Sequence, residues 1–250
     1  DSDSIDMLEW DGTIDHGSNT DYLAMLEYLR NNDISQSVHY EHICNQMDID
    51  EYLDYVIAQI FINNTDWPGN NSKWWREQKP GSKWRWIMYD TDFGFGIWGQ
   101  PVWYNMFVLA TLENGVNWPN PDWSTFLLRT LLKNPDFRAL FINRFTAYLG
   151  TTFRSGRTRT ILDSCQKNIN YEVPYDRTRW NLSTTQWWNN VNAMRNYSLL
   201  RPGYVYQQLV EFFGLGSPLS LSVHSSVNGG SFIVNDVITT DTVFSGKYYS

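Results

Sequence analysis

Apolar positions recur with helical spacing through most of the chain. Residues 18–33, "SNTDYLAMLEYLRNND", place Leu23, Leu26 and Leu29 on one face behind the capping candidates of segment 18–20. Residues 49–62 form a longer and strongly apolar stretch that predicts a buried helix. The turn formers "NNTDWPGNN" follow it and predict a loop.

The next pattern is aromatic and short. "KWWREQ" and "KWRWIMYD" stand on either side of "KPGS", which predicts a β-hairpin within residues 72–90. Helical patterns then return in "DWSTFLLRTLL" and "NPDFRALFINRFTAYLG". In the second, Asn134 is a cap, Pro135 suits the first turn and Gly150 is a stop signal. Further helices are predicted at 155–169, 184–198 and 202–213.

The texture changes at Pro218. The segments "LSLSVHSS", "GGSFIVND" and "TVFSGKYYS" are short, alternating and separated by Gly-rich turns, which predicts strands. The pattern thus favours a mainly α (α+β) fold. We expect one domain over residues 1–217, with a helical lobe at 18–213 interrupted by the hairpin, and a small β element of an appended module over 218–250.

Composition narrows the classes of partner. The chain has 250 residues and a net charge of −8, which argues against nucleic acid or an anionic membrane as the main partner. It contains no apolar run of eighteen residues, so we expect no membrane span. The 13 Trp and 15 Tyr beside many Asn, Ser and Thr are common in secreted bacterial proteins that meet carbohydrate.

Candidate chemistry gathers around the hairpin. Asp66 lies in the loop after the buried helix, Asn71 follows five residues later, and the hairpin ends at Asp90 and Asp92 in "YDTDFGFG". Protein kinases use this order: an Asp orients the attacking hydroxyl, while an Asn and a later Asp hold magnesium ions. Solvated acidic turns are the alternative reading. The pair Asp163 and Asn168 has the same offset within a helical pattern and serves as a decoy.

At these residues the chain resembles the CotH family, the spore-coat protein H group of atypical bacterial protein kinases. The resemblance is carried by "FINNTDWPGNNSKWWRE", "GSKWRWIMYDTDFGFG" and "SIDMLEWDGTIDHGSNTDYLAMLEYL". The family's Asn-x-Asp loop, the Asn five positions later and the acidic pair match a set of five residues here: Asn64, Asp66, Asn71, Asp90 and Asp92. Tyr89 departs from the family's pattern, because many members have Trp before the first acid.

The resemblance implies a kinase-like second lobe that transfers phosphate from ATP to Ser or Thr of a coat or surface protein, outside a bacterial cell. Asp66 would be the catalytic base. Asn71, Asp90 and Asp92 would bind Mg or Mn, with Asp90 the principal ligand, and Asn71 and Asp90 would also contact the ATP complex. A first lobe with a phosphate-binding Lys or Arg is largely absent from these residues, so we expect weak transfer by this chain alone.

Two other readings stay open. The Trp residues around the hairpin suit stacking on sugars or on adenine. Core packing is the default for most of them, but Trp67, next to the presumed base, is a candidate cofactor contact. A carbohydrate-active protein would use paired carboxylates such as Asp90 and Asp92. A non-catalytic surface or adhesion module would keep the kinase-like fold without transfer.

Overall fold

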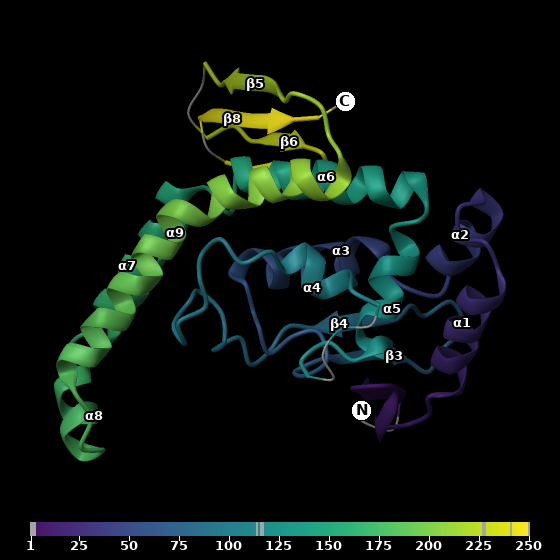
Figure 1. The fold of residues 1–250 in the computed structure, drawn as a ribbon, viewed down its shortest axis with the longest axis horizontal. Coiled ribbons are helices and arrows are strands. Elements are labelled where there is room, and N and C mark those ends of the chain that lie inside the picture. Colours follow the sequence, from purple (N-terminus) through teal and green to yellow (C-terminus); the bar gives the residue numbers. More distant parts are fainter. Residues whose placement is uncertain (1–3, 114, 116–117, 227–228, 241, 250) are drawn as a thin grey trace. The chain divides into compact units, whose positions relative to one another are not determined.

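The computed structural model describes residues 4–113, 115, 118–226, 229–240 and 242–249 (Figure 1). Helices hold 50% of the structure so described and strands 15%, which confirms the mainly helical α+β class. The helices are α1 (Thr20–Asn31), α2 (Ser37–Cys44), α3 (Ile49–Ile62), α4 (Met106–Thr111), α5 (Asp122–Leu131), α6 (Pro135–Gly150), α7 (Ser155–Ile169), α8 (Val173–Arg179) and α9 (Thr184–Phe213). The strands are β1 (Ile5–Glu9), β2 (Thr13–His16), β3 (Lys73–Glu77), β4 (Arg85–Ile87), β5 (Leu219–His224), β6 (Phe232–Val234), β7 (Val237–Thr239) and β8 (Val243–Tyr248).

The chain divides into two compact units. The first unit comprises residues 1–91 and 106–142, and the second comprises 92–105 and 143–250. The predicted domain boundary at 217/218 was placed where the sequence pattern changes from helical to strand-like. That boundary stays a prediction. The units differ in charge: the first has 9 Lys and Arg against 20 Asp and Glu, and the second has 10 against 7. The first unit therefore carries −11 and the second +3.

The first unit is built on a sheet with strand order β2-β1-β3-β4, in which all neighbours are antiparallel. Helix α3 packs on β4, and the aromatic rings of the hairpin pack against α1 and α3. Tyr22 lies 4.8 Å from Trp74 and 5.4 Å from Trp84, and Tyr52 lies 4.5 Å from Trp86, measured between ring centroids. Most of the hairpin tryptophans are therefore core residues, as their default reading predicted.

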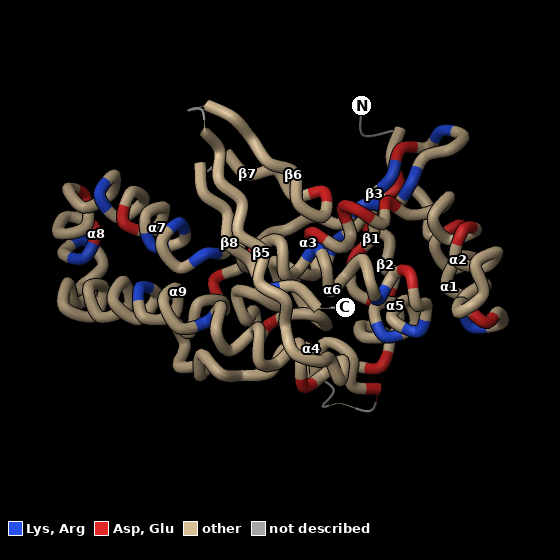
Figure 2. Tube along the Cα trace, turned by 90° about the horizontal axis from the view of Figure 1, so that it is seen from above, with Lys and Arg blue, Asp and Glu red and all other residues tan. Residues whose placement is uncertain are grey.

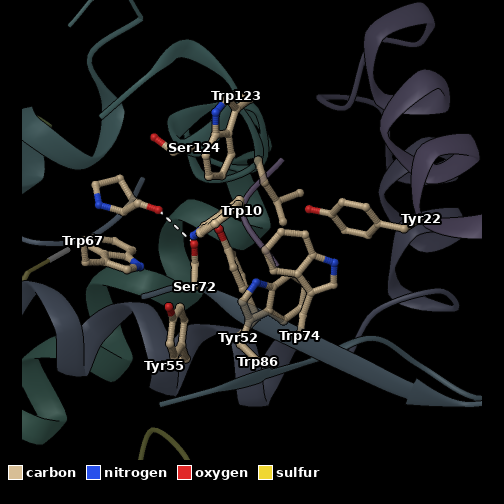
Figure 3. Close-up of a pocket in the computed structure, with 12 residues that line it drawn as sticks. Trp10, Tyr22, Tyr52, Tyr55, Trp67, Ser72, Trp74, Trp86, Trp123 and Ser124 are labelled. Atoms are coloured by element: carbon tan, nitrogen blue, oxygen red, sulfur yellow. Dashed lines mark hydrogen bonds between the residues drawn. The ribbon is translucent and has the colours of Figure 1, made fainter. Parts of the chain in front are cut away.

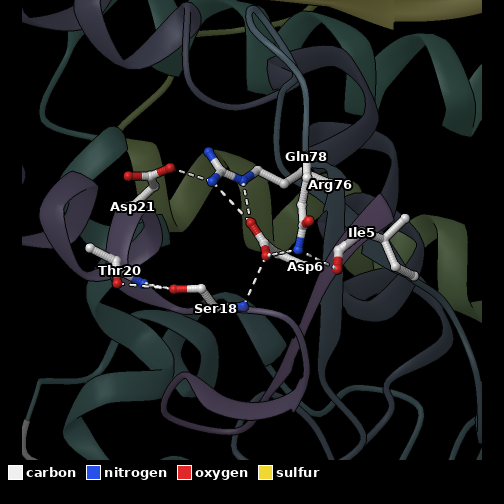
Figure 4. Close-up of polar contacts among 7 residues, drawn as sticks. All are labelled: Ile5, Asp6, Ser18, Thr20, Asp21, Arg76 and Gln78. Carbon is white, nitrogen blue, oxygen red and sulfur yellow. Dashed lines mark hydrogen bonds and ion pairs between the residues drawn. The ribbon is translucent and has the colours of Figure 1, made fainter. Parts of the chain in front are cut away.

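A buried carboxylate ties β1 to its neighbours (Figure 4). The Asp6 side chain is 3% exposed and accepts hydrogen bonds from Arg76, Gln78 and the Ser18 amide at 2.9–3.0 Å. Arg76 also pairs with Asp21 at the start of α1. Gly17 stands beside this carboxylate at φ +73°, and a Cβ there would lie 2.4 Å from Asp6 Oδ1, so only glycine fits.

In the second unit, α7 and α8 pack along α9, and Lys and Arg recur along these helices (Figure 2). Arg201 of α9 is fully buried and donates from Nη1 to the carbonyls of Val102 and Tyr104, each at 2.8 Å. These bonds hold the loop 92–105. Strand β5 pairs with β8, and β6 pairs with β7. Phe244 of β8 is buried, and a Cβ on Gly150, the last residue of α6, would lie 3.0 Å from its ring.

None of the helices in the described part of the chain has the length and apolar character that crossing a lipid bilayer requires.

Candidate active site

The candidate site begins where α3 ends. Asn63 caps the helix in the left-handed conformation, at φ 59° and ψ 47°. Asn64 is fully buried and links the helix to the loop: its Nδ2 donates to Gln59 Oε1 at 3.0 Å, and its Oδ1 accepts from the Asp66 amide at 3.2 Å. Asn tolerates such a helix end and such a short-range bond better than other residue types. The family's Asn-x-Asp spacing is thus the spacing of a side-chain-to-backbone turn.

Asp66 is buried and is held by amides. It is 5% exposed, and its Oδ2 accepts from Asn70 Nδ2 at 2.8 Å and from Asn71 Nδ2 at 2.6 Å. Within the described residues no Lys or Arg pairs with it, and its Oδ1 accepts no hydrogen bond. Two amide donors therefore fix the carboxylate while leaving one oxygen without a partner.

The hairpin brings Asp90 back to this loop. Lys73 pairs with Ile87 and Trp74 with Trp86, so the strands lead residues 70–71 and 89–90 to the same end of the hairpin. Asn71 Nδ2 reaches the Asp90 carbonyl oxygen at 3.3 Å. Asn71 and Asp90 both adopt positive φ, 51° and 47°, a conformation that Asn and Asp enter more readily than most residues. The structure thus joins Asp66, Asn71 and Asp90.

The remaining candidates, Asp92 and Asp163, belong to the second unit. Asp92 begins the second unit, where it is exposed and its carbonyl accepts from Trp98 Nε1 at 3.1 Å; its metal role stays a prediction. The decoy Asp163 lies on α7 and pairs with Arg195 at 2.7 Å and Arg159 at 3.7 Å. A cation of the protein already occupies that carboxylate, unlike Asp66.

Trp67 points into an aromatic cavity of the first unit (Figure 3). Its ring is 4% exposed and lies 6.2 Å from Tyr55, edge to face. The cavity measures about 40 Å³, room for roughly one or two water molecules. As the structure stands, that space is too small for a nucleobase, and the role of Trp67 as a cofactor contact stays a prediction.

The donor chemistry fits a small divalent cation. Asn71 uses its Nδ2 on Asp66 and Asp90, which leaves its Oδ1 for another partner, and the Asp90 side chain is exposed. Mg²⁺ prefers such oxygen ligands and commonly keeps several waters. No cluster of three His, Cys, Asp or Glu with metal-binding geometry occurs in the described residues. An ion here would rest on Asn71, Asp90, water and phosphate oxygens.

Three further residues lie beside this site, and their contacts were not predicted from the sequence. Asn70 is the second amide on Asp66, Ser72 bonds the Pro68 carbonyl through its hydroxyl at 3.2 Å, and the Trp10 amide donates to the Ser72 carbonyl at 3.3 Å. The doubled Asn in "PGNN" was the available signal for the first. Burial raises the pKa of Tyr89, the residue before Asp90, so its phenol stays protonated at neutral pH.

One protein family matches most of the chain. The family described as CotH kinase protein matches residues 7–205, a span that includes the Asp66 loop, the hairpin and Asp90. No curated protein and no solved structure matches the chain significantly. Since the family match extends over well more than half of the sequence, the chain belongs to the CotH kinase protein family.

Proposed function

We propose that this chain is a metal-dependent protein kinase domain that transfers the γ-phosphate of ATP to a Ser or Thr hydroxyl. Asp66 is the base, and Asn71 and Asp90 hold Mg²⁺ or Mn²⁺, with Asp92 as a further ligand. The acceptor is a coat or surface protein outside a bacterial cell. Membership of the CotH kinase protein family supports the reaction class.

The observation that carries the proposal is the shared amide of Asn71. One Nδ2 bonds both the Asp66 carboxylate and the Asp90 backbone, so the loop bearing the base and the loop bearing the metal ligand are joined. Phosphoryl transfer depends mainly on such positioning and on charge neutralisation.

The Asp66 carboxylate suits the role of base. Its Oδ2 is held by two amides, and its Oδ1 accepts no bond from the described residues. A substrate hydroxyl can therefore donate to Oδ1 and lose its proton there.

The metal supplies the remaining charge. When bound, Mg²⁺ or Mn²⁺ would neutralise the phosphate oxygens of ATP. The Asn71 amide oxygen and the carboxylates of Asp90 and Asp92 are the groups of this chain that would hold it. Asn71 and Asp90 belong to a unit of net charge −11. Such a unit attracts a cation and repels phosphate that carries no metal ion.

Transfer of labelled phosphate from ATP to casein tests the proposal, using the natural full-length protein with Mg²⁺ or Mn²⁺. Asp66→Asn should lower the rate by roughly 100-fold or more, because general-base catalysis is lost. Asp163→Asn removes the decoy carboxylate and should leave the rate unchanged. Equal rates for wild type and Asp66→Asn would refute the assignment of the base, and no metal-dependent transfer at all would favour a non-catalytic surface module.

A further inference from the structure

An open pocket of the first unit adjoins the candidate site. It measures about 430 Å³, and its walls include Trp10, Trp118 and Trp123 with the polar residues Asp11, Thr13 and Asn70. Asn70 is the residue whose Nδ2 bonds Asp66. The pocket shares Trp10 and Trp123 with the small aromatic cavity of Figure 3, so the two hollows adjoin at these residues.

Trp10 is held in an unfavourable conformation. It occupies the turn between β1 and β2 at φ 54°, a region that bulky residues rarely enter. Its amide bonds the Ser72 carbonyl, and its side chain is still 48% exposed. Burial of the ring does not explain this backbone strain. Such outliers gather at ligand sites, where the surrounding structure fixes a side chain for use.

The part of the pocket wall that contains Trp118 contacts the loop that carries Asp66. Gly69, between Trp67-Pro68 and Asn70, donates its amide to the Pro119 carbonyl, and a Cβ on Gly69 would lie 2.4 Å from that oxygen. This close backbone contact positions Trp118, which is 57% exposed. Trp123 comes from the first turn of α5. Three indole rings from three segments therefore surround a space with polar groups at its edge.

The chemistry of the walls selects the ligand. Indole faces bind apolar ring faces, and Asp11, Thr13 and Asn70 offer hydrogen bonds to hydroxyl groups. No Lys or Arg of the described residues lines the pocket, and the unit carries −11, which disfavours phosphates and other anions. A pyranose ring has apolar C–H faces and hydroxylated edges without charge. We propose that this pocket binds a neutral saccharide ring.

The position of the pocket gives the saccharide a role. Asn71 joins Asp66 to Asp90 on the metal side, and Asn70 joins Asp66 to the pocket. A bound ring thus lies on the acceptor side of the base, where it would retain a glycan or a glycosylated protein. This role rests on the proposed function, whereas saccharide binding itself does not.

Titration with cellotetraose, xylotetraose and chitotetraose tests the site. Binding is measured by tryptophan fluorescence and by calorimetry, without ATP or metal. We expect saturable binding of at least one. Trp118→Ala removes a stacking surface, and Asp11→Asn replaces a charged acceptor with a weaker neutral one, so each should weaken binding by roughly tenfold. Trp180→Ala is the matched control, because Trp180 is 62% exposed in the second unit and should not matter.

Both variants alter exposed side chains, and thermal melts of each establish that they are folded. The proposal is overturned if no saccharide binds at millimolar concentration, if Trp118→Ala and Asp11→Asn bind as wild type does, or if AMP or a Ser-rich peptide occupies the pocket in place of a sugar. Saccharide titration needs neither ATP nor metal, so failure of phosphoryl transfer and failure of this site give different results.

Discussion

Asn71 connects the two loops of the candidate site through a single side-chain amide. Its Nδ2 lies 2.6 Å from Asp66 Oδ2 and 3.3 Å from the Asp90 carbonyl, and its backbone is left-handed at φ 51°. Two separate costs therefore follow from replacing it. One is the lost hydrogen bond to a charged group. The other is the strain of the left-handed backbone, which Asn tolerates better than most other residues that have a Cβ.

Two substitutions separate these costs. Asn71→Gly keeps the backbone relaxed and should lower the free energy of unfolding by about 2 kcal/mol, the value of a bond to a charged group. Asn71→Ala should lower it by about 1 kcal/mol more, because alanine, unlike glycine, is strained in the left-handed conformation. Urea denaturation measures both. An Asn71→Gly protein as stable as wild type would show that the amide bond contributes nothing.

At the residue scale, the sequence indicated which side chains local spacing brings together, and it gave no sign of those that only the fold brings together; their roles stay predictions. Asp66, Asn71 and Asp90 come together because a helix end and a hairpin of fixed register place them so. Trp10 reaches the same loop from sixty residues away through one backbone bond to Ser72, and no local pattern encodes that contact. The decoy Asp163 shows that spacing alone is ambiguous, since its partner is Arg195.

At the scale of elements, β1 depends on the buried Asp6. Burial raises the pKa of Asp6, but bonds from Ser18, Gln78 and Arg76 outweigh it and bring the pKa below the ordinary 3.8. The stabilisation is therefore fully present above the unfolded-state pKa and is lost as the pH falls through the lower folded-state value.

Asp6→Asn should lower the free energy of unfolding by about 3 kcal/mol at pH 7, because it leaves Arg76 without its buried partner. The deficit should stay constant down to about pH 5 and shrink below about pH 4, as the unfolded chain and then, at lower pH, folded Asp6 take up a proton. Asp21→Asn is the control, since the side chain of Asp21 is 61% exposed and its pair should contribute less than about 1 kcal/mol. A deficit that persists unchanged into acid would contradict this account.

In the second unit, Arg201 is likewise a buried charged residue that holds a neighbouring segment through hydrogen bonds. Arg201→Lys should cost about 2–3 kcal/mol, because a single ammonium cannot replace the guanidinium bonds to Val102 and Tyr104 in a buried position. Hydrogen exchange should then accelerate in residues 92–105, the loop that begins with Asp92. Unchanged exchange there would mean that other contacts hold the loop.

The elements themselves were predicted well where the pattern is local. Helix α3 runs over Ile49–Ile62 and α7 over Ser155–Ile169, as expected, and Asn134 caps α6 through bonds from Asp136 and Phe137. Strands β1 and β2 were not predicted, because β1 is stabilised by pairing with β3 some seventy residues later.

Helix α9 also differs from its prediction. It continues through Pro202, where two helices were expected, and it bends partway along its length (Figure 1). Proline removes one helical hydrogen bond and commonly kinks a helix without ending it. The buried contacts of Arg201 and Val205 on either side outweigh that loss.

At the scale of the whole molecule, the two units differ in net charge. The first unit carries −11 and holds the candidate metal ligands Asn71 and Asp90, and the second carries +3. A divalent cation in the first unit would relieve the mutual repulsion of its acids as well as complete the site. Metal binding should therefore stabilise the fold, and the thermal midpoint should rise with metal concentration.

Thermal melts of the 250-residue chain, titrated with Mg²⁺ and Mn²⁺, test the central claim most directly. Wild type and Asp163→Asn should show the same metal-dependent rise in melting temperature, because Asp163 is paired with Arg195. Asp90→Asn should show almost none, while its metal-free form melts no lower than wild type. A full metal-dependent rise in Asp90→Asn, or an equal loss in Asp163→Asn, would contradict a metal site built on Asn71 and Asp90.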